Sequence, residues 1–486
     1  MKRLIVIVFI IFGAFLTFSL YRTLAYDTSV VEEVPSTTDL EYTFKIGNSS
    51  IKQITVDSGK TRYYDIVLGN PNNAKISYSV YYEMVSPTTK PDGFSIEYTS
   101  KSTGESTGIV DKNGNITLNL VVTNTSSNAV TVKLGTVAGY VKGGELVLNS
   151  GQEVIPKRVF PKANIYVESL DDGSTGDSGS GVYKIEHNAI PAESSATGSE
   201  IPAVTDYRYY GASPNNYICL DMEGSSTCPD KHLYRIIGSI YEEKENTNRI
   251  KVIKATPLTD GTTKNFSWDY TSSGTNTNIW ATITSGNYSN SLTSGSQLMK
   301  LLNSGAWWNG TSGSYYNDDN GIATTVDFTN YKLSNKAKSY VTTSRYYLGG
   351  YSASDEVMTN QFYDYERGTA RYDTSRPLYW DGNVGLMYPS DYGYAAGNTC
   401  VTGTTPNNYK GGCYQKDWLF NSNDEWLMSP CSVSSSFSFL LYSNGYVGYT
   451  VNVGYAKKVY PTFYLSKDVI ITGGTGSLED PYLVTK

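Results

Sequence analysis

Cysteine is the residue type with the most definite chemistry in this chain, which contains five of them. Cys219 and Cys228 flank a Gly/Ser turn, and Cys400 and Cys413 flank a loop rich in Gly, Pro and Asn. Short loops bring two thiols together most easily, and closing one stabilises a fold by about 2–3 kcal/mol. We therefore predict the disulfides Cys219–Cys228 and Cys400–Cys413, with Cys431 free and buried. The alternative joins Cys431 to Cys400 or to Cys413.

Neighbouring carboxylates offer a second kind of chemistry, because two carboxyl groups roughly 5–10 Å apart can hydrolyse a glycosidic bond. Such pairs lie at 355–356, 364–366 and 424–425, but closeness in sequence does not fix their distance in space. We interpret them as loop acids. The two histidines, His187 and His232, are too few for three zinc ligands, and no catalytic motif occurs in a supporting context. We expect no metal site, no cofactor and no enzymatic activity.

Aromatic residues are the one enriched type that indicates binding, since the chain has 43 Tyr and seven Trp. Flat aromatic faces stack on sugar rings and anchor protein interfaces at low entropic cost. Several of them stand in polar, loop-like contexts. The predicted binding residues are Trp307, Trp308, Tyr315, Tyr316, Tyr363, Tyr365 and Trp380.

The N-terminus indicates the compartment. Residues 1–26 contain Lys2 and Arg3, followed by an uncharged apolar run from Leu4 to Leu20. Positive charge before such a run keeps the N-terminus in the cytoplasm and places the rest of the chain outside. We predict a signal-anchor helix, with a cleaved signal peptide as the alternative. The protein would then lie on the outer face of a bacterial plasma membrane, or be secreted if the segment is cleaved.

Composition excludes one class of partner. Acidic residues outnumber basic ones by 46 to 39 in the 486 residues, which gives a formal net charge of −7. A nucleic-acid-binding protein needs a basic face, so we expect no nucleic-acid partner. The high aromatic content argues against a disordered chain.

Residues 40–167 have the pattern of a β-sandwich. Ile76, Tyr78, Val80 and Tyr82 alternate with more polar neighbours, as in strands with one buried face. Turn-forming residues separate the successive runs. Seven such strands, with a possible closing strand at the end, suggest an immunoglobulin-like sandwich. The strand-like runs are 42–46, 51–56, 63–68, 76–84, 94–98, 116–123, 130–137 and the closing 163–167.

The rest of the chain divides into a linker and a head. Residues 168–205 contain a Gly/Ser/Asp tract without apolar period, which is typical of flexible coil. Residues 206–486 carry every Trp and Cys, with short strands among long polar loops and helical patterns at 295–303 and 333–342. We predict a mainly β protein with minor α, whose head is a loop-rich α+β domain held by disulfides.

The head resembles a module found in surface proteins of gut Firmicutes, over about residues 207–486. At the level of fold it is similar to C-type-lectin-like and formylglycine-generating-enzyme-like domains. That family usually has Arg just before the Pro of the block that begins here at Pro461, and Tyr460 replaces it in this chain, which weakens any role for a charge at that position. The segments that carry the resemblance are Asn216-Tyr217-Ile218-Cys219, Leu233-Tyr234-Arg235-Ile236, Val384-Gly385-Leu386-Met387-Tyr388-Pro389, Asp424-Glu425-Trp426-Leu427-Met428-Ser429-Pro430 and Pro461-Thr462-Phe463-Tyr464-Leu465-Ser466.

These expectations combine into a surface recognition or adhesion protein. An Ig-like spacer would present a C-type-lectin-like head to a glycan or protein ligand on another surface, and the N-terminal helix would hold the protein in the membrane. Two alternatives remain. One is a carboxylate-based enzyme acting on surface polysaccharide, and the other is a structural fibre subunit.

Overall fold

The structure is a computed structural model, and its chain divides into two compact units, Met1–Val159 and Phe160–Lys486. The protein is mainly β, with 40% strand and 15% helix. The ranges described here are 43–46, 53–100, 108–141, 146–156, 160–171, 173–271, 276–284, 287–288, 292–316, 323–351 and 356–486.

The N-terminal helix expected over residues 1–26 lies outside the described residues. None of the helices within the described ranges has the length and apolar character that a membrane crossing requires.

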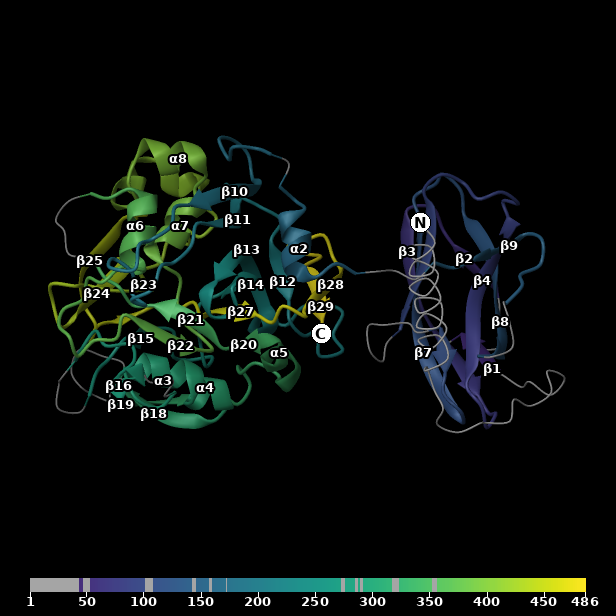
Figure 1. Cartoon of the computed structure of the whole chain (residues 1–486), viewed down its shortest axis with the longest axis horizontal. Coiled ribbons are helices and arrows are strands. Elements are labelled where there is room, and N and C mark those ends of the chain that lie inside the picture. Colours follow the sequence, from purple (N-terminus) through teal and green to yellow (C-terminus); the bar gives the residue numbers. More distant parts are fainter. Residues whose placement is uncertain are drawn as a thin grey trace, which may run out of the picture. The chain divides into compact units, whose positions relative to one another are not determined.

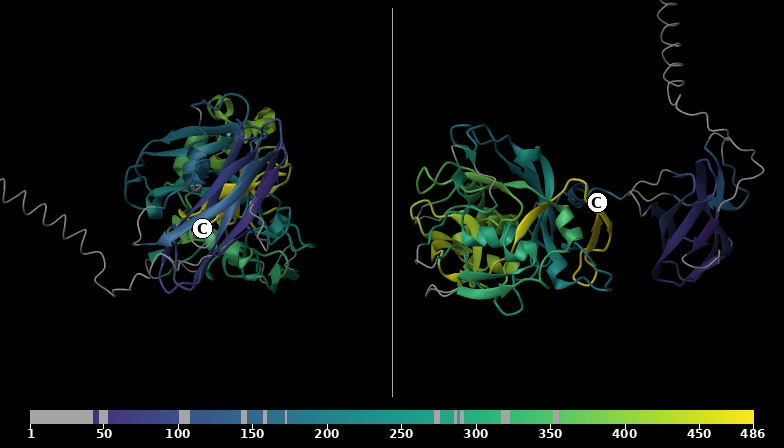
Figure 2. Two further views of the ribbon diagram at one scale, coloured as in Figure 1. Left: turned by 90° about the vertical axis from the view of Figure 1, so that its right-hand side faces the viewer. Right: turned by 90° about the horizontal axis from the view of Figure 1, so that it is seen from below.

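The first unit contains two antiparallel sheets. One has the strand order β1-β3-β7-β5, and the other has the order β2-β8-β4-β6, with β9 also paired to β4. The long strands run alongside one another and can be followed from three directions (Figures 1 and 2). The bounds are β1 Thr43–Ile46, β2 Gln53–Val56, β3 Lys60–Asn70, β4 Ile76–Ser86, β5 Phe94–Ser100, β6 Ile109–Val110, β7 Gly114–Asn124, β8 Val130–Tyr140 and β9 Gln152–Val154.

Both sheets contribute to one apolar core. In β4, Ile76, Tyr78, Val80 and Tyr82 are buried while the residues between them are half-buried. Such alternation is what a strand with one inward face produces. The seven strands predicted between residues 42 and 137 are confirmed.

The second unit is built around a nine-stranded mixed sheet. Its main path is β20-β27-β14-β13-β12-β29-β28, and the hairpin β10-β11 joins it through β13. The pairing of β12 with β29 is parallel. The bounds are β10 Gly181–His187, β11 Val204–Tyr210, β12 Tyr217–Cys219, β13 Leu233–Glu242, β14 Thr247–Lys254, β20 Val341–Thr342, β27 Thr462–Leu465, β28 Ile470–Gly473 and β29 Tyr482–Thr485.

Smaller elements surround this sheet (Figure 1). A three-stranded sheet is formed by β23 Glu425–Pro430, β24 Phe437–Leu441 and β25 Val447–Asn452. The two-stranded pairs are β15 Phe266–Ser267 with β26 Ala456–Lys457, β16 Ile283–Thr284 with β17 Asn287–Tyr288, β18 Ser312–Tyr316 with β19 Ala323–Asp327, and β21 Ser344–Tyr347 with β22 Tyr379–Gly382.

Short helices cover the unit, and those predicted at 295–303 and 333–342 are confirmed as α3 and α5. Helix α2 packs on β13 and β14, and α7 packs on β11 and β23. The α-helices are α2 Ala163–Glu168, α3 Gln297–Asn303, α4 Ala306–Asn309, α5 Asn335–Tyr340, α6 Thr359–Glu366, α7 Pro389–Ala395 and α8 Asn398–Gly403. The 3₁₀ helices are η2 Asp230–His232, η3 Glu243–Glu245, η4 Pro406–Gly411 and η5 Cys413–Lys416.

An ionic network lies inside the second unit, among strands β10, β11 and β14 and helix α7. Arg208 donates to Asp391 Oδ1 at 2.7 Å and to Asp206 Oδ2 at 2.9 Å. Lys251 Nζ lies 2.5 Å from Asp391 Oδ2, and His187 Nε2 lies 3.0 Å from Asp206 Oδ2. All five residues are buried. Burial raises the pKa of Asp391, but Lys251 and Arg208 outweigh it and hold that pKa below its usual value.

The predicted linker 168–205 is wrong, because its residues belong to the second unit. Strand β10 pairs with β11 along seven residues. The Gly/Ser/Asp tract is held by α8: Asn398 N donates to Gly176 O at 2.8 Å, and Thr399 donates to Asp177 O at 2.9 Å. Gly176 has a φ of +71°, so the glycine serves a turn and not a flexible coil.

The predicted boundaries shift as a consequence. The first unit ends at residue 159, not at 167, and the second begins at residue 160, not at 206. The closing strand expected at 163–167 is instead the helix α2. Ala163 and Val167 are buried whereas Ile165 between them is 52% exposed, which suits one face of a helix, because in a strand all three side chains would share a face.

Candidate anion-binding pocket

A pocket in the second unit forms where four segments of the chain meet. Strand β14 ends at Lys254, whose backbone N donates to Pro461 O at 3.0 Å. The 3₁₀ helix η2 contributes its first two residues, and Lys458 follows β26 with its backbone N donating to Asp424 O at 2.9 Å. The cavity has a volume of about 300 Å³. Its lining residues are Asp230, Lys231, Lys254, Thr256, Pro257, Leu258, Thr259, Lys264, Tyr331 and Lys458.

Lys254 is the most constrained cation of the pocket, because only 6% of the residue is exposed. Its ammonium donates to Asp230 O at 2.9 Å and to Thr256 Oγ1 at 2.8 Å. Burial lowers the pKa of Lys254 to about 8, against a smaller opposing effect of the Asp230 carboxylate. The group is therefore mostly protonated at neutral pH.

Lys458 and Lys264 add two further ammonium groups. Burial lowers the pKa of Lys458, and repulsion from Lys264 lowers it further. Lys231 also lines the pocket, but its ammonium lies 2.9 Å from Glu223 Oε2. A local excess of positive charge in a chain of net charge −7 favours an anionic ligand, which would relieve the repulsion.

The lining residues of the pocket also supply an aromatic ring and hydroxyl groups. Tyr331 is 37% exposed and lies against Gly261. A Cβ at Gly261 would lie 2.3 Å from the Tyr331 hydroxyl, and Gly261 also has a φ of +91°, so glycine suits this position on both counts. A ring next to ammonium groups fits a sugar that carries a carboxylate, sulfate or phosphate. Of the described lining residues, Asp230 alone has a carboxylate, so the pocket lacks the pair of carboxyls that glycoside hydrolysis uses.

Four of the seven predicted aromatic binding residues are buried. Trp307, Tyr315, Tyr363 and Trp380 are each at most 3% exposed. The Tyr315 hydroxyl donates to Ser267 O at 2.5 Å. Their rings fill the core, so the prediction that these four present a binding surface is wrong.

The Tyr363 ring shows how a polar context can hide a core position. His187 stacks on it with the two ring centres 3.6 Å apart, and the Arg367 guanidinium lies 3.4 Å from its centre. One charged neighbour along the chain, Arg367, and one distant residue, His187, therefore pack onto the ring, so a polar sequence context does not indicate exposure.

The remaining three predicted aromatics are half-buried and lie on separate elements. Trp308 is in α4, with the Lys338 ammonium 5.2 Å from its ring centre. Tyr316 is in β18, and Tyr365 is in α6, where it stacks on Tyr351. None of the seven lines the lysine pocket.

The cysteine prediction is confirmed in full. Cys219 and Cys228 form one disulfide, and Cys400 and Cys413 form the other. Cys431 is free and buried.

Three buried carboxyls bear on the enzymatic alternative. Burial raises the pKa of Glu366 to about 7 and that of Glu425 to about 8, and it raises the pKa of Asp417, with a further contribution from Glu425. All three residues are at most 4% exposed. None of them lines the lysine pocket or the small cavity beside Cys431.

Sequence reasoning missed the lysines of the pocket. Lys254 and Lys264 are close along the chain, but Lys458 is far from both. The pair Lys457-Lys458 is the one local signal, since a basic dipeptide stands out in an acidic chain. Only the sheet register, which sets the end of β14 beside β27, brings these segments together.

Comparison of the chain with protein-family models, with curated proteins and with solved structures finds no match.

Proposed function

We propose that the protein recognises an acidic glycan on another surface, and that the lysine pocket of the second unit binds the anionic group. The observation that carries the proposal is the gathering of Lys254, Lys264 and Lys458 around one cavity of about 300 Å³. The exposed Tyr331 ring beside them would stack on the sugar. Specificity would then come from charge and ring together.

The same proposal places the protein outside the cell. Two disulfides favour an oxidising compartment, and the apolar segment within residues 1–26 would tether the chain to a bacterial membrane. The first unit would act as an Ig-like spacer, and the second would be a C-type-lectin-like head. Binding fits the pocket better than the enzymatic alternative, since none of the described carboxyls with a raised pKa lines it.

A charge-resolved binding experiment tests the function. The purified chain is screened on an array of neutral, carboxylated and sulfated glycans, and the affinity of the best ligand is measured by calorimetry. We expect retention of acidic glycans alone. Lys458→Ala should weaken binding about tenfold, because it removes a charge-assisted hydrogen bond. Added salt should weaken binding as well.

Lys467→Ala is the matched control, because Lys467 is an exposed lysine of the same unit that does not line the pocket. It should bind like the unchanged chain. Preference for neutral glycans, or equal affinity of the Lys458→Ala variant, would exclude the proposed ligand class. Release of reducing ends from the glycan would instead support the enzymatic alternative.

A further inference from the structure

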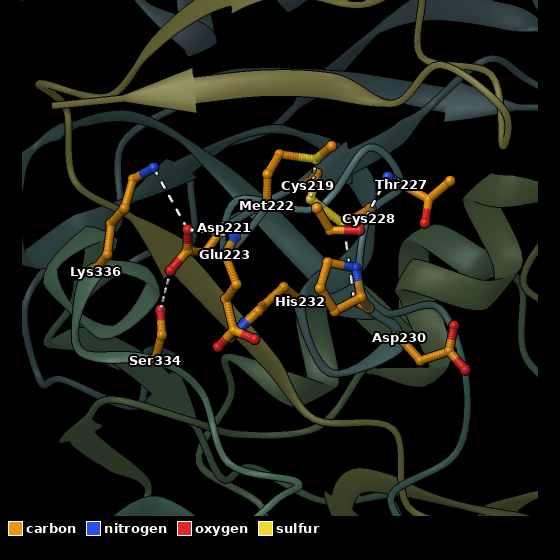
Figure 3. Close-up of a disulfide and its surroundings, with 12 residues drawn as sticks. Cys219, Asp221, Met222, Glu223, Thr227, Cys228, Asp230, His232, Ser334 and Lys336 are labelled. Carbon is orange, nitrogen blue, oxygen red and sulfur yellow. Dashed lines mark hydrogen bonds and ion pairs between the residues drawn. A yellow bond between two sulfur atoms is a disulfide. The ribbon is translucent and has the colours of Figure 1, made fainter.

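A histidine and two carboxylates meet beside the Cys219–Cys228 disulfide (Figure 3). One potential ligand atom from each of Asp221, Glu223 and His232 lies within 4.8 Å of the other two. Both carboxylates belong to the loop that the disulfide closes, and His232 follows that loop as the last residue of η2. The cluster is thus formed by one short, crosslinked stretch of chain.

Strand pairing and a local turn set this arrangement. Cys219 of β12 pairs with Leu233 of β13, and Leu220 N donates to His232 O at 3.0 Å. Glu223 N donates to Asp221 Oδ1 at 3.1 Å. The loop and the histidine are therefore held together by backbone hydrogen bonds as well as by the disulfide.

The imidazole has little else to bind. His232 is fully buried, and its Nε2 lies 3.0 Å from Glu223 Oε1. Its Nδ1 has no hydrogen-bond partner among the described residues. The one side chain that holds the ring is thus the carboxylate that would share a metal ion with it.

The carboxylates have partners that a cation can replace. Lys231 Nζ lies 2.9 Å from Glu223 Oε2, and Lys336 Nζ lies 3.5 Å from Asp221 Oδ1. Both lysine side chains are partly exposed and can move into solvent. Ser334 donates to Asp221 Oδ2 at 2.6 Å and would keep that carboxylate oriented when Lys336 leaves.

We propose that Asp221, Glu223 and His232 bind a divalent transition-metal ion of the Zn²⁺ type. One imidazole nitrogen and two carboxylate oxygens suit such an ion, whereas Ca²⁺ and Mg²⁺ prefer ligand sets made of oxygen alone. A single histidine suffices because the carboxylates supply the other two ligands. The ion would join the disulfide loop to η2 and would stabilise the second unit by binding its folded form. This site adjoins the proposed glycan pocket through Lys231, which lines that pocket and pairs with Glu223, but it is tested without a glycan.

Calorimetric titration of the whole chain with ZnCl₂ tests the site. We expect one Zn²⁺ per chain, and Ca²⁺ at least about tenfold weaker. Glu223→Gln should weaken Zn²⁺ binding by about tenfold or more, since it replaces a charged ligand with an amide. Glu223 is exposed, so this change should leave the unit folded. Glu479→Gln is the matched control at another exposed glutamate and should bind Zn²⁺ like the unchanged chain.

A variant with a gain in affinity separates a metal site from a purely structural cluster. Lys336→Ala removes an ammonium group that competes for Asp221, so it should tighten Zn²⁺ binding by about threefold. Unfolding cannot produce such a gain. Absence of stoichiometric binding, binding that Glu223→Gln leaves intact, or weaker binding by the Lys336→Ala variant would each overturn the proposal.

Discussion

The two units of this protein stabilise their interiors in different ways. The first unit buries apolar side chains such as Val80, Leu118 and Leu120 between two sheets, and none of its described buried residues carries a charge. The second unit buries a network of charges around Arg208 and Asp391 together with many aromatic rings. An apolar core depends on area and packing, whereas an ionic core depends on keeping each charge with its partners. Single substitutions should therefore act differently in the two units.

Asp391→Asn should have the largest effect on stability. It leaves the buried cations Arg208 and Lys251 without the carboxylate that both contact. Removing one partner of a buried ion pair costs about 3–5 kcal/mol. Chemical denaturation, followed by the tryptophan fluorescence of the second unit, measures the loss.

The matched control is Asp111→Asn in the first unit, whose unfolding is followed by calorimetry because the tryptophans all lie in the second unit. Asp111 pairs with Lys75 at 2.9 Å, but both side chains are more than half exposed. An exposed pair contributes less than about 1 kcal/mol. A similarly small loss for Asp391→Asn would show that the buried network does not determine the stability of the second unit.

Leu120→Ala should have the next largest effect, confined to the first unit. The side chain is fully buried in β7, and its removal costs about 2–5 kcal/mol through lost burial and the resulting cavity. The unfolding transition of the first unit should move to lower temperature in calorimetry, while that of the second stays in place. A shift of both transitions would show that the two units do not unfold independently.

This difference between the units explains why the buried residues of the first unit could be predicted from the sequence and the ionic network of the second could not. In the first unit, alternation of Ile76, Tyr78 and Val80 with polar neighbours reports burial directly, because a strand with one wet face repeats every two residues. In the second unit, Arg208 and Asp391 are far apart in sequence, and no local pattern pairs them. The short loops closed by disulfides were predictable because both partners lie close along the chain.

Predictions from composition were wrong where contacts between residues distant in sequence determine whether a segment is ordered or buried. The Gly/Ser/Asp tract around Gly176 has the composition of a linker, yet hydrogen bonds from α8 order it. Trp380 stands among polar residues, yet it packs against Tyr346 and Trp280 in the core. The lysine pocket requires Lys458 to lie beside Lys254. The pairing of β14 with β27 brings the two residues together, and no local sequence pattern predicts it.

Measured per pH unit, the smallest expected effect, and the most specific to the second unit, is a change in the pH dependence of its stability. Glu425 is buried, Asn421 donates to its Oε2 at 2.5 Å, and its Oε1 has no partner among the described residues. Burial raises the pKa of Glu425 to about 8, from 4.5 in an exposed chain.

Below pH 4.5 the folded and unfolded states both hold the Glu425 proton, so the protonated carboxyl contributes its full stabilisation of the folded state there. Between the unfolded-state pKa of 4.5 and the folded-state pKa of about 8, only the folded state keeps this proton. This carboxyl therefore makes the free energy of unfolding fall as pH rises to about 8, by up to about 1.4 kcal/mol per pH unit.

Glu425→Gln keeps the shape and cannot titrate. Denaturation of the second unit at pH 5, 6, 7 and 8 should give a flatter profile for this variant, with its advantage over the unchanged chain growing toward pH 8. Parallel profiles would mean that Glu425 is already ionised in the folded protein, and the second unit would then tolerate a buried charge without a cationic partner.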